Sequence, residues 1–305
     1  MKSKSSVFLL VDGNAIIHRA FHALPPTLTD SKGNPTNAVF GFARILFAAI
    51  KQFKPQNIAV AFDVAGKTFR DELFVEYKAK RIKAPQELYD QIPVVHKMCD
   101  ALEIPHFGIE GFEADDIIGT LTKKIPKEYK DAETIILTGD GDTLQLVNGR
   151  VKVAMPARGI QPPQVYNHAA VEGKIGLPPE KIIDYKALRG DASDNIPGVK
   201  GIGEKTAVDL LKKFDSLDGI YKNLDKVTSE SVRQKLIDGK EMAQLSQELA
   251  TIKTDIKLDF KIKDTKVHDF DRKRAVEFFE SLHMRSLIKQ LPESHREAGD
   301  QTALF

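Results

Sequence analysis

Short apolar runs, each followed closely by an aspartate, divide the first half of the chain. Three of them span residues 7–11, 58–62 and 134–138. Uninterrupted runs of this length are typical of strands that are buried on both faces of a parallel sheet. The aspartates that follow them are Asp12, Asp63 and Asp140. Because the carboxyl ends of parallel strands open onto one crevice, we expect these three side chains to lie near each other.

Segments with the helical spacing of apolar residues separate these runs. They cover residues 38–53, 86–102 and 114–124, so strand and helix alternate. The alternation predicts an α/β fold with a central, mainly parallel sheet flanked by helices. A run at 151–155 predicts a further strand, after which the chain is predicted to be helical to about residue 283. A nucleotide-binding Rossmann domain matches less well, because the turn after the first run, residues 12–15, contains a single glycine.

Composition excludes several classes of protein. The 305 residues are 42% hydrophobic and 29% charged, as expected of a globular protein with one or two domains. The formal net charge of +2 indicates no particular partner. Cys99 is the single cysteine, which excludes an internal disulfide and a cysteine-built zinc site. Since no apolar stretch is long enough for a signal peptide or a membrane span, we expect a cytoplasmic protein.

Acidic residues beyond the strand ends form a second pattern. Nine of them stand singly or in tight groups: Asp12, Asp63, Glu113, Asp115, Asp116, Asp140, Asp142, Asp191 and Asp194. Carboxylates that meet in one cleft repel each other unless cations neutralise them, and oxygen ligands alone select hard ions such as Mg²⁺ or Mn²⁺. Two such ions about 4 Å apart suit displacement at phosphorus. Each group alone is also explained as a solvated face or a helix cap, although a cap does not account for Asp116.

Glycines near residue 200 indicate a DNA-binding turn. The turn consists of Gly198, Val199, Lys200, Gly201, Ile202 and Gly203. It leads into a helix that is predicted to begin near Glu204 and to include Lys205 and Thr206. Backbone N–H groups at such a turn grip a phosphate without reading a base, as in a helix-hairpin-helix motif. An ordinary glycine turn between two helices is the alternative.

Basic and aromatic residues are interleaved between residues 66 and 83. The cations are Lys67, Arg70, Lys78, Lys80, Arg81 and Lys83, and the rings are those of Phe69, Phe74 and Tyr77. Such a segment is typical of proteins that track single-stranded DNA and stack its bases. A solvated helix with lysine stems packed on aromatic rings explains the same pattern.

Together these motifs resemble the 5′ nucleases of the flap endonuclease superfamily, in particular the N-terminal 5′–3′ exonuclease domain of bacterial DNA polymerase I. The resemblance extends to about residue 291. It is carried by residues 10–14, 62–63, 69–70, 77–81, 111–116, 138–142 and 190–207. It implies a PIN-like nuclease domain over residues 1–175 with a helical arch near 66–90, a helical region with the helix-hairpin-helix motif over 176–291, and a flexible tail over 292–305.

The resemblance also implies roles for single residues. One metal ion would be held by Asp12, Asp63, Glu113 and Asp115, and the other by Asp140, Asp142 and Asp194, with Asp116 and Asp191 as outer or alternative ligands. Tyr77, Lys78 and Arg81 would steer the 5′ strand, and Lys78 and Arg70 would contact the scissile phosphate. Asp12, Lys78 and Arg81 are the expected catalytic residues. The hairpin turn would hold duplex DNA, in the family often with a bound K⁺ ion.

Two positions depart from the family pattern. Gly141 stands where a lysine or arginine is usual, and Ile82 and Lys83 replace a commonly proline-containing part of the arch. We therefore expect weaker phosphate steering near the second metal ion and a changed arch geometry. Neither change removes a ligand.

The last five residues form a separate motif. Gln301, Leu304 and Phe305 match the Gln-x-x-Leu-Phe sequence with which bacterial proteins dock on the sliding clamp. A flexible tether with two apolar anchors suits a shallow groove. We expect a nuclease without an attached polymerase that the clamp recruits. An arbitrary tail or a fragment of a longer chain is the alternative.

The expected function is a Mg²⁺- or Mn²⁺-dependent 5′–3′ exonuclease and flap endonuclease, a monomer that works at the nucleoid in the cytoplasm. Its substrates would be DNA with 5′ flaps, nicks or RNA primers. A non-catalytic factor that binds branched DNA would not need all the acids. A Mg²⁺-dependent phosphatase would leave the arch and the hairpin unexplained.

Overall fold

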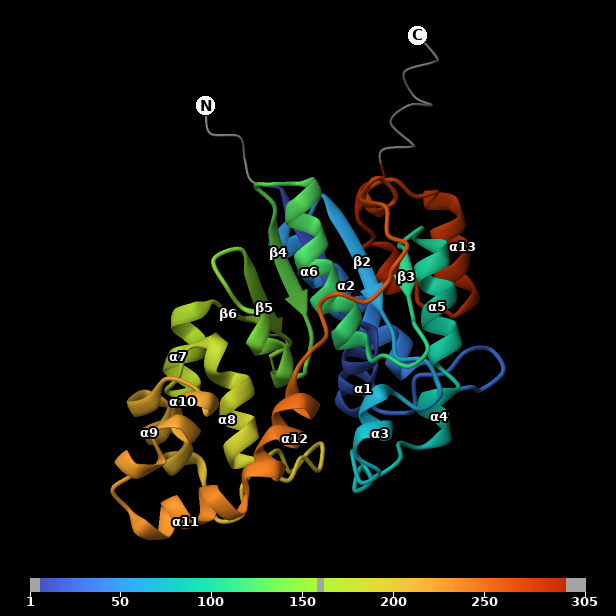
Figure 1. Ribbon diagram of the computed structural model, residues 1–305. Coiled ribbons are helices and arrows are strands. Elements are labelled where there is room, and N and C mark those ends of the chain that lie inside the picture. The colour runs from blue at the N-terminus through green and yellow to red at the C-terminus, as the bar shows by residue number, and fades with distance from the viewer. Residues whose placement is uncertain (1–5, 158–161, 295–305) are drawn as a thin grey trace.

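The computed structural model, which describes residues 6–157 and 162–294, is built around a six-stranded sheet (Figure 1). The strands, in the spatial order β3-β2-β1-β4-β5-β6, are β3 (His106–Phe107), β2 (Asn57–Ala61), β1 (Val7–Asp12), β4 (Glu133–Leu137), β5 (Val151–Met155) and β6 (Gln164–Tyr166). All neighbours pair in parallel except β6, which is antiparallel to β5. The four predicted strands and their parallel pairing are confirmed. The two strands that were not predicted are too short to leave an apolar run.

Helices cover both faces of the sheet because side chains alternate along each strand. From β1, Leu9 and Val11 enter a core with α1 (Gly13–Ala23), α2 (Asn37–Phe53) and α5 (Ile92–Ala101). Phe8 and Leu10 of the same strand enter the opposite core, which α6 (Ala114–Glu128) covers. Burial on both faces explains why the strand sequences are apolar without interruption.

A separate bundle of helices lies beyond one end of the sheet (Figure 1). Its members are α7 (His168–Ile175), α8 (Ile182–Arg189), α9 (Glu204–Phe214), α10 (Leu217–Lys222), α11 (Glu230–Asp238) and α12 (Lys240–Ala250). Their core includes Leu188, Leu211 and Leu236. The predicted helix start at Glu204 is confirmed. None of the helices in the described ranges combines the length and the apolar composition that crossing a membrane requires.

Beyond α12 the chain returns to the sheet, which corrects the prediction of continuous helix to residue 283. Residues 251–261 form neither helix nor strand, and Ile252 and Phe260 pack beside α6. Two further helices, α13 (Arg272–Ser281) and α14 (Arg285–Ile288), then pack on the opposite face beside α2 and α5. Figure 1 shows this orange-to-red segment running from α12 past α6 to α13. The proposed domain boundary at residue 175 stays a prediction.

The arch segment, residues 66–90, contains less helix than predicted. It consists of α3 (Phe69–Leu73), a run of turns over residues 75–80 and the single turn α4 (Gln86–Tyr89). The helix predicted over 86–102 is interrupted between α4 and α5. Pro93 lies in the first turn of α5, where its missing N–H costs nothing, and Gln91 turns its side chain to the backbone N–H of Ala38. Short 3₁₀ helices lie at Gly141–Leu146, Pro179–Lys181, Leu224–Lys226 and Ile262–Thr265.

Candidate active site

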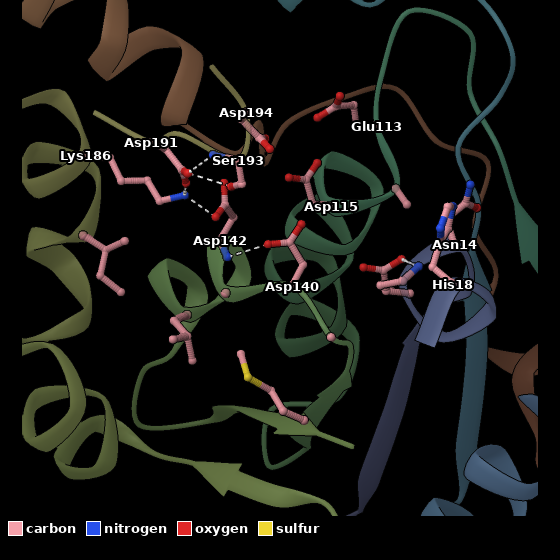
Figure 2. Close-up of a pocket in the computed structure, with 18 of the residues that line it drawn as sticks. Asn14, His18, Glu113, Asp115, Asp140, Asp142, Lys186, Asp191, Ser193 and Asp194 are labelled. Carbon is pink, nitrogen blue, oxygen red and sulfur yellow. Dashed lines mark hydrogen bonds and ion pairs between the residues drawn. The ribbon is translucent and has the colours of Figure 1, made fainter. Parts of the chain in front are cut away.

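The carboxyl ends of β1, β2 and β4 open onto a cavity of about 970 Å³ (Figure 2). Eight of the nine predicted acidic residues line it, namely Asp12, Asp63, Glu113, Asp115, Asp140, Asp142, Asp191 and Asp194. They come from the strand ends, from the start of α6 and from the loop after α8. The convergence that the parallel strands predict is therefore present, and Asp116 is the one acid that is not among the lining residues.

Asp12 is anchored where β1 passes into α1. Its carboxylate accepts hydrogen bonds from the Ala15 backbone N–H at 3.0 Å and from the Thr138 hydroxyl at 2.7 Å. Burial raises the pKa of Asp12 to about 7, and the nearby carboxylate of Asp63 acts in the same direction. The close approach of α1 to β2 depends on Gly13, because a Cβ atom there would lie 2.2 Å from the Phe62 ring. A cation beside Asp12 would stabilise its ionised form.

Two more carboxylates stand at the N-terminus of α6. Glu113 is the N-cap of the helix and forms a capping box with Asp116. Asp115 points into the cavity, and its Oδ1 atom is buried without a hydrogen-bond partner. Burial raises the pKa of the Asp115 carboxyl well above its usual range. An unpaired buried carboxylate oxygen that faces a cavity is the environment that a metal ion would satisfy.

Asp116 and Arg70 form a buried ion pair, which corrects two predictions. The guanidinium binds both carboxylate oxygens of Asp116, at 2.8 and 2.9 Å, and donates to the backbone carbonyls of Leu249 and Thr251. Arg70 is 1% exposed and Asp116 is fully buried. Arg70 therefore has no surface with which to contact a phosphate, and Asp116 has no free oxygen to bind a metal ion directly. An outer role for Asp116 stays a prediction. The pair instead ties the base of the arch to α6 and to the segment that follows α12.

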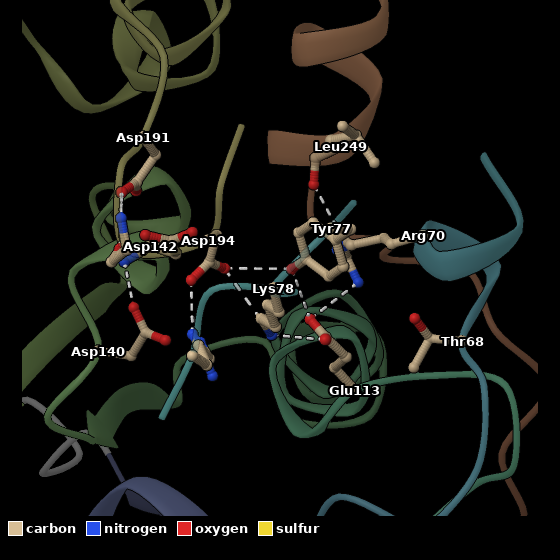
Figure 3. A network of polar contacts seen from close by, with 12 residues as sticks. Thr68, Arg70, Tyr77, Lys78, Glu113, Asp140, Asp142, Asp191, Asp194 and Leu249 are labelled. Carbon is tan, nitrogen blue, oxygen red and sulfur yellow. Dashed lines mark hydrogen bonds and ion pairs between the residues drawn. The ribbon is translucent and has the colours of Figure 1, made fainter. Parts of the chain in front are cut away.

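The tip of the arch lies against the acidic residues (Figure 3). The Lys78 ammonium is 2.5 Å from Glu113 and 3.7 Å from Asp194, and Arg81 is 2.5 Å from Asp194. The Tyr77 hydroxyl contacts both carboxylates, at 3.2 and 3.1 Å. Lys78 and Arg81 line the cavity as predicted. Tyr77 does not present a surface to DNA, because its ring is buried beside apolar residues of α12.

A lysine that the motifs do not include also enters the cavity. Lys186 of α8 binds Asp191 at 2.6 Å and also binds Asp142 (Figure 2). Although partial burial raises the pKa of Asp191, the ammonium of Lys186 lowers it to about 2. Burial raises the pKa of Asp142 to about 6 in spite of the same ammonium. The sequence carries a weak signal for this role, since Lys186 stands on the otherwise apolar face of its helix.

The donor set fits divalent metal ions. Eight of the predicted carboxylates and Glu204 line the cavity, and the described cavity wall contributes no cysteine. Within residues 6–157 and 162–294, however, no three acidic, histidine or cysteine side chains converge closely enough to form a ready-made metal site. The cationic groups of Lys78, Arg81 and Lys186 lie among the carboxylates instead. The residues that would hold one ion are Asp12, Asp63, Glu113 and Asp115, and those for the other are Asp140, Asp142 and Asp194.

The glycine turn has the geometry of a tight hairpin between α8 and α9. Gly198 and Gly201 have φ angles of 62° and 80°, which favour glycine, and a Cβ atom on Gly198 would lie 2.2 Å from the Gly190 nitrogen. Val199 and Ile202 are buried in the helical core, so these two side chains pack and do not face a ligand. The exposed residues of the predicted set are Lys200, Gly201, Gly203 and Lys205, with Thr206 half-buried.

The predicted clamp-binding residues cannot be placed. Gln301, Leu304 and Phe305 lie outside the described residues. Phe279 is buried in the core beside α2 and α5, with Phe278 and Leu282 packed against that core, and Cys99 is buried in it as well.

Comparison with known families identifies two matching family models. The 5′–3′ exonuclease N-terminal resolvase-like domain matches residues 7–176, and the 5′–3′ exonuclease C-terminal SAM fold matches residues 177–273. DNA polymerase I of Bacillus subtilis is 42% identical over 296 residues, which cover 97% of this chain and 33% of that protein. The chain thus spans about a third of the length of this polymerase relative. The 5′–3′ exonuclease of Aquifex aeolicus is 39% identical over 296 residues, covering 97% of this chain and 98% of that protein.

Solved structures share the fold at lower identity. The T5 5′-exonuclease with bound zinc ions matches with a TM-score of 0.68 and 20% identity, covering 93% of this chain and 97% of that chain. The catalytic core of Rad2 in complex with a DNA substrate matches with a TM-score of 0.60 and 16% identity, covering 94% and 92%. The two family models together cover residues 7–273, which include all the residues that line the cavity, and with the Aquifex relative they lead to one conclusion: this chain belongs to the 5′–3′ exonuclease family.

Proposed function

We propose that the chain is a divalent-metal-dependent 5′–3′ exonuclease and 5′-flap endonuclease that hydrolyses phosphodiester bonds in DNA. The observation that carries the proposal is the cavity at the strand ends, where eight of the predicted carboxylates meet the cations of the arch. Membership of the 5′–3′ exonuclease family supports the same reaction. A DNA-binding factor without catalysis would not need a buried, unpaired carboxylate oxygen such as that of Asp115.

The chain's own residues would act as follows. Two divalent ions, when held by the carboxylates, would supply a hydroxide nucleophile and would neutralise the charge that develops on the leaving oxygen. Lys78 and Arg81, which line the cavity, would turn from Glu113 and Asp194 to the scissile phosphate. Asp12 is held in place by Ala15 and Thr138, so its oxygens need little rearrangement when an ion binds.

The hairpin is the proposed contact to duplex DNA. Lys200 and Lys205 are exposed on either side of the turn. Gly203 is the N-cap of α9, and no side chain of its own caps the first N–H groups of that helix. We assign the two catalytic ions as Mg²⁺ or Mn²⁺ from the all-oxygen donor set. A K⁺ ion at the hairpin is part of the proposal, on the resemblance of the turn to the helix-hairpin-helix motif of the family.

The substrates we propose are DNA with a 5′ flap, a nick or an RNA primer, processed in replication and repair. The enzyme would act as a monomer at the nucleoid in the cytoplasm. The match of Gln301, Leu304 and Phe305 to a clamp-docking sequence supports recruitment by the sliding clamp. Removing these last five residues is expected to abolish binding to the clamp and to leave cleavage of free DNA unchanged.

The test is Mg²⁺-dependent cleavage of a 5′-flap duplex by the wild type and by Asp115→Asn. We expect cleavage to fall at least 10³-fold while the dissociation constant for the flap duplex, measured in EDTA, changes less than tenfold. Asp225→Asn, a substitution at an exposed carboxylate of the helical bundle, is the matched control and is expected to cleave normally. Full cleavage by Asp115→Asn would contradict the metal assignment. Uncleaved DNA with the wild type would contradict the proposed function.

A further inference from the structure

The ammonium group of Lys186 occupies a buried position between Asp142, a member of the proposed second metal group, and Asp191, its proposed outer or alternative ligand (Figure 2). Lys186 is 8% exposed, and its Nζ atom donates to Asp191 at 2.6 Å and to Asp142. Asp191 is held from its other side by the backbone N–H and the hydroxyl of Ser193, at 2.9 and 2.6 Å. The three charged side chains therefore form a connected and well-anchored set.

The two proposed metal groups differ in how many cations of the protein they already bind. In the first group, Asp12 and Asp63 accept hydrogen bonds from backbone N–H and hydroxyl groups, and Asp115 has an unpartnered oxygen. Among its members, the ion pairs of the described residues include Glu113 alone, which pairs with Arg70 and Lys78. In the second group, Lys186 binds Asp142 and the arch cations bind Asp194, and Lys186 also binds the outer Asp191. Two of the three members, Asp142 and Asp194, are thus paired with cations of the protein before any metal ion arrives, whereas the described ion pairs do not include Asp140.

We propose that Lys186 is a built-in cation of the second metal group, which holds Asp142 and Asp191 together in the absence of metal and competes with the second metal ion for their oxygens. The proposal rests on the function proposed above. An ammonium has three N–H donors and can serve both carboxylates at once, so the buried charges are compensated. A divalent ion on the same oxygens would face that ammonium at contact distance, where like charges repel strongly.

Exchange of the two cations is possible because Lys186 stands at the wall of the cavity on a flexible four-carbon stem. The second ion can bind Asp142 only when the ammonium moves away from it. The consequence is ordered loading: the first group binds its ion without internal competition, and the second binds its ion more weakly. Lys186 is accordingly a positioning residue. Its removal should strengthen binding of the second metal ion, whereas removal of a residue that only supports the ligands should weaken it.

The test is Mn²⁺ binding to the full chain by calorimetry, comparing the wild type with Lys186→Met. Two classes of site are expected in the wild type. In Lys186→Met the dissociation constant of the weaker class is expected to fall about tenfold, equivalent to about 1.4 kcal/mol. Lys174→Met is the matched control, since Lys174 lines the same cavity but lies over the Tyr166 ring, and its weaker class is expected to be unchanged. Unchanged or weaker binding in Lys186→Met would overturn the proposal.

A second measurement uses the wild type alone and does not depend on the folding of a variant. Lysine acylation followed by mass spectrometry is expected to label Lys186 slowly in EDTA and at least five times faster at saturating Mg²⁺, because the displaced ammonium becomes accessible. Equal labelling in the two conditions would overturn the proposal. A wild type that binds no Mn²⁺ would instead contradict the proposed function, so the two failures are distinguishable.

Discussion

Replacing Arg70 with alanine is expected to destabilise the fold and not to remove a DNA contact. The substitution strands the fully buried carboxylate of Asp116, which would retain hydrogen bonds from the Glu113 and Lys253 backbone N–H groups but no counter-charge. Breaking a buried ion pair by removing one partner costs about 3–5 kcal/mol. The carbonyls of Leu249 and Thr251 lose their donors as well. Since a domain is stable by about 5–15 kcal/mol in total, Arg70→Ala would leave little margin.

The assay is urea denaturation followed by circular dichroism, with DNA binding measured on the same samples. Lys67→Ala is the control, because Lys67 is exposed in the same segment and its loss should change stability by less than about 0.5 kcal/mol. The double variant Arg70→Leu with Asp116→Leu removes both charges and should recover part of the lost stability. An Arg70→Ala protein that is as stable as the wild type but binds DNA at least tenfold more weakly would refute the reasoning.

Three further predictions concern the hairpin, the metal ions and the arch. Gly198→Ala should lower the free energy of unfolding by about 2 kcal/mol or more, because the added Cβ atom would collide with Gly190. Gly149→Ala is the control, since a Cβ atom there meets open space and should not lower it. Thermal denaturation compares the two variants. The pKa of Asp12 is about 7, so below that pH a metal ion must displace the proton of its carboxyl group. The affinity for Mn²⁺, measured by calorimetry, should therefore rise about tenfold from pH 6 to pH 8 and then level off. A flat pH profile would contradict this. Lys78→Met should slow single-turnover flap cleavage about 100-fold while the dissociation constant for DNA changes less than tenfold, and the reverse pattern would make Lys78 a binding residue only.

Much of the fold is determined locally and was therefore predictable from the sequence. Runs such as residues 7–11 are apolar without interruption because both faces of the sheet are covered, and parallel strands present their carboxyl ends at one edge. Asp12, Asp63 and Asp140 could be brought together on that rule alone. The hairpin was predictable for a similar reason, since positive φ angles at Gly198 and Gly201 leave a glycine pattern in the sequence.

The roles of the charged side chains were decided by the tertiary structure. Arg70 and Lys78 stand eight residues apart in one basic segment and look alike in the sequence, yet the first is buried and the second faces the cavity. What separates them is the partner each meets: Arg70 reaches a carbonyl 179 residues away, and Lys78 reaches a carboxylate 35 residues away. The sequence shows that a residue carries charge, whereas the cost of burying that charge depends on which groups the fold places within hydrogen-bond distance. The same dependence separates Asp115, which faces the cavity unpaired, from Asp116, its neighbour, which is neutralised in the core.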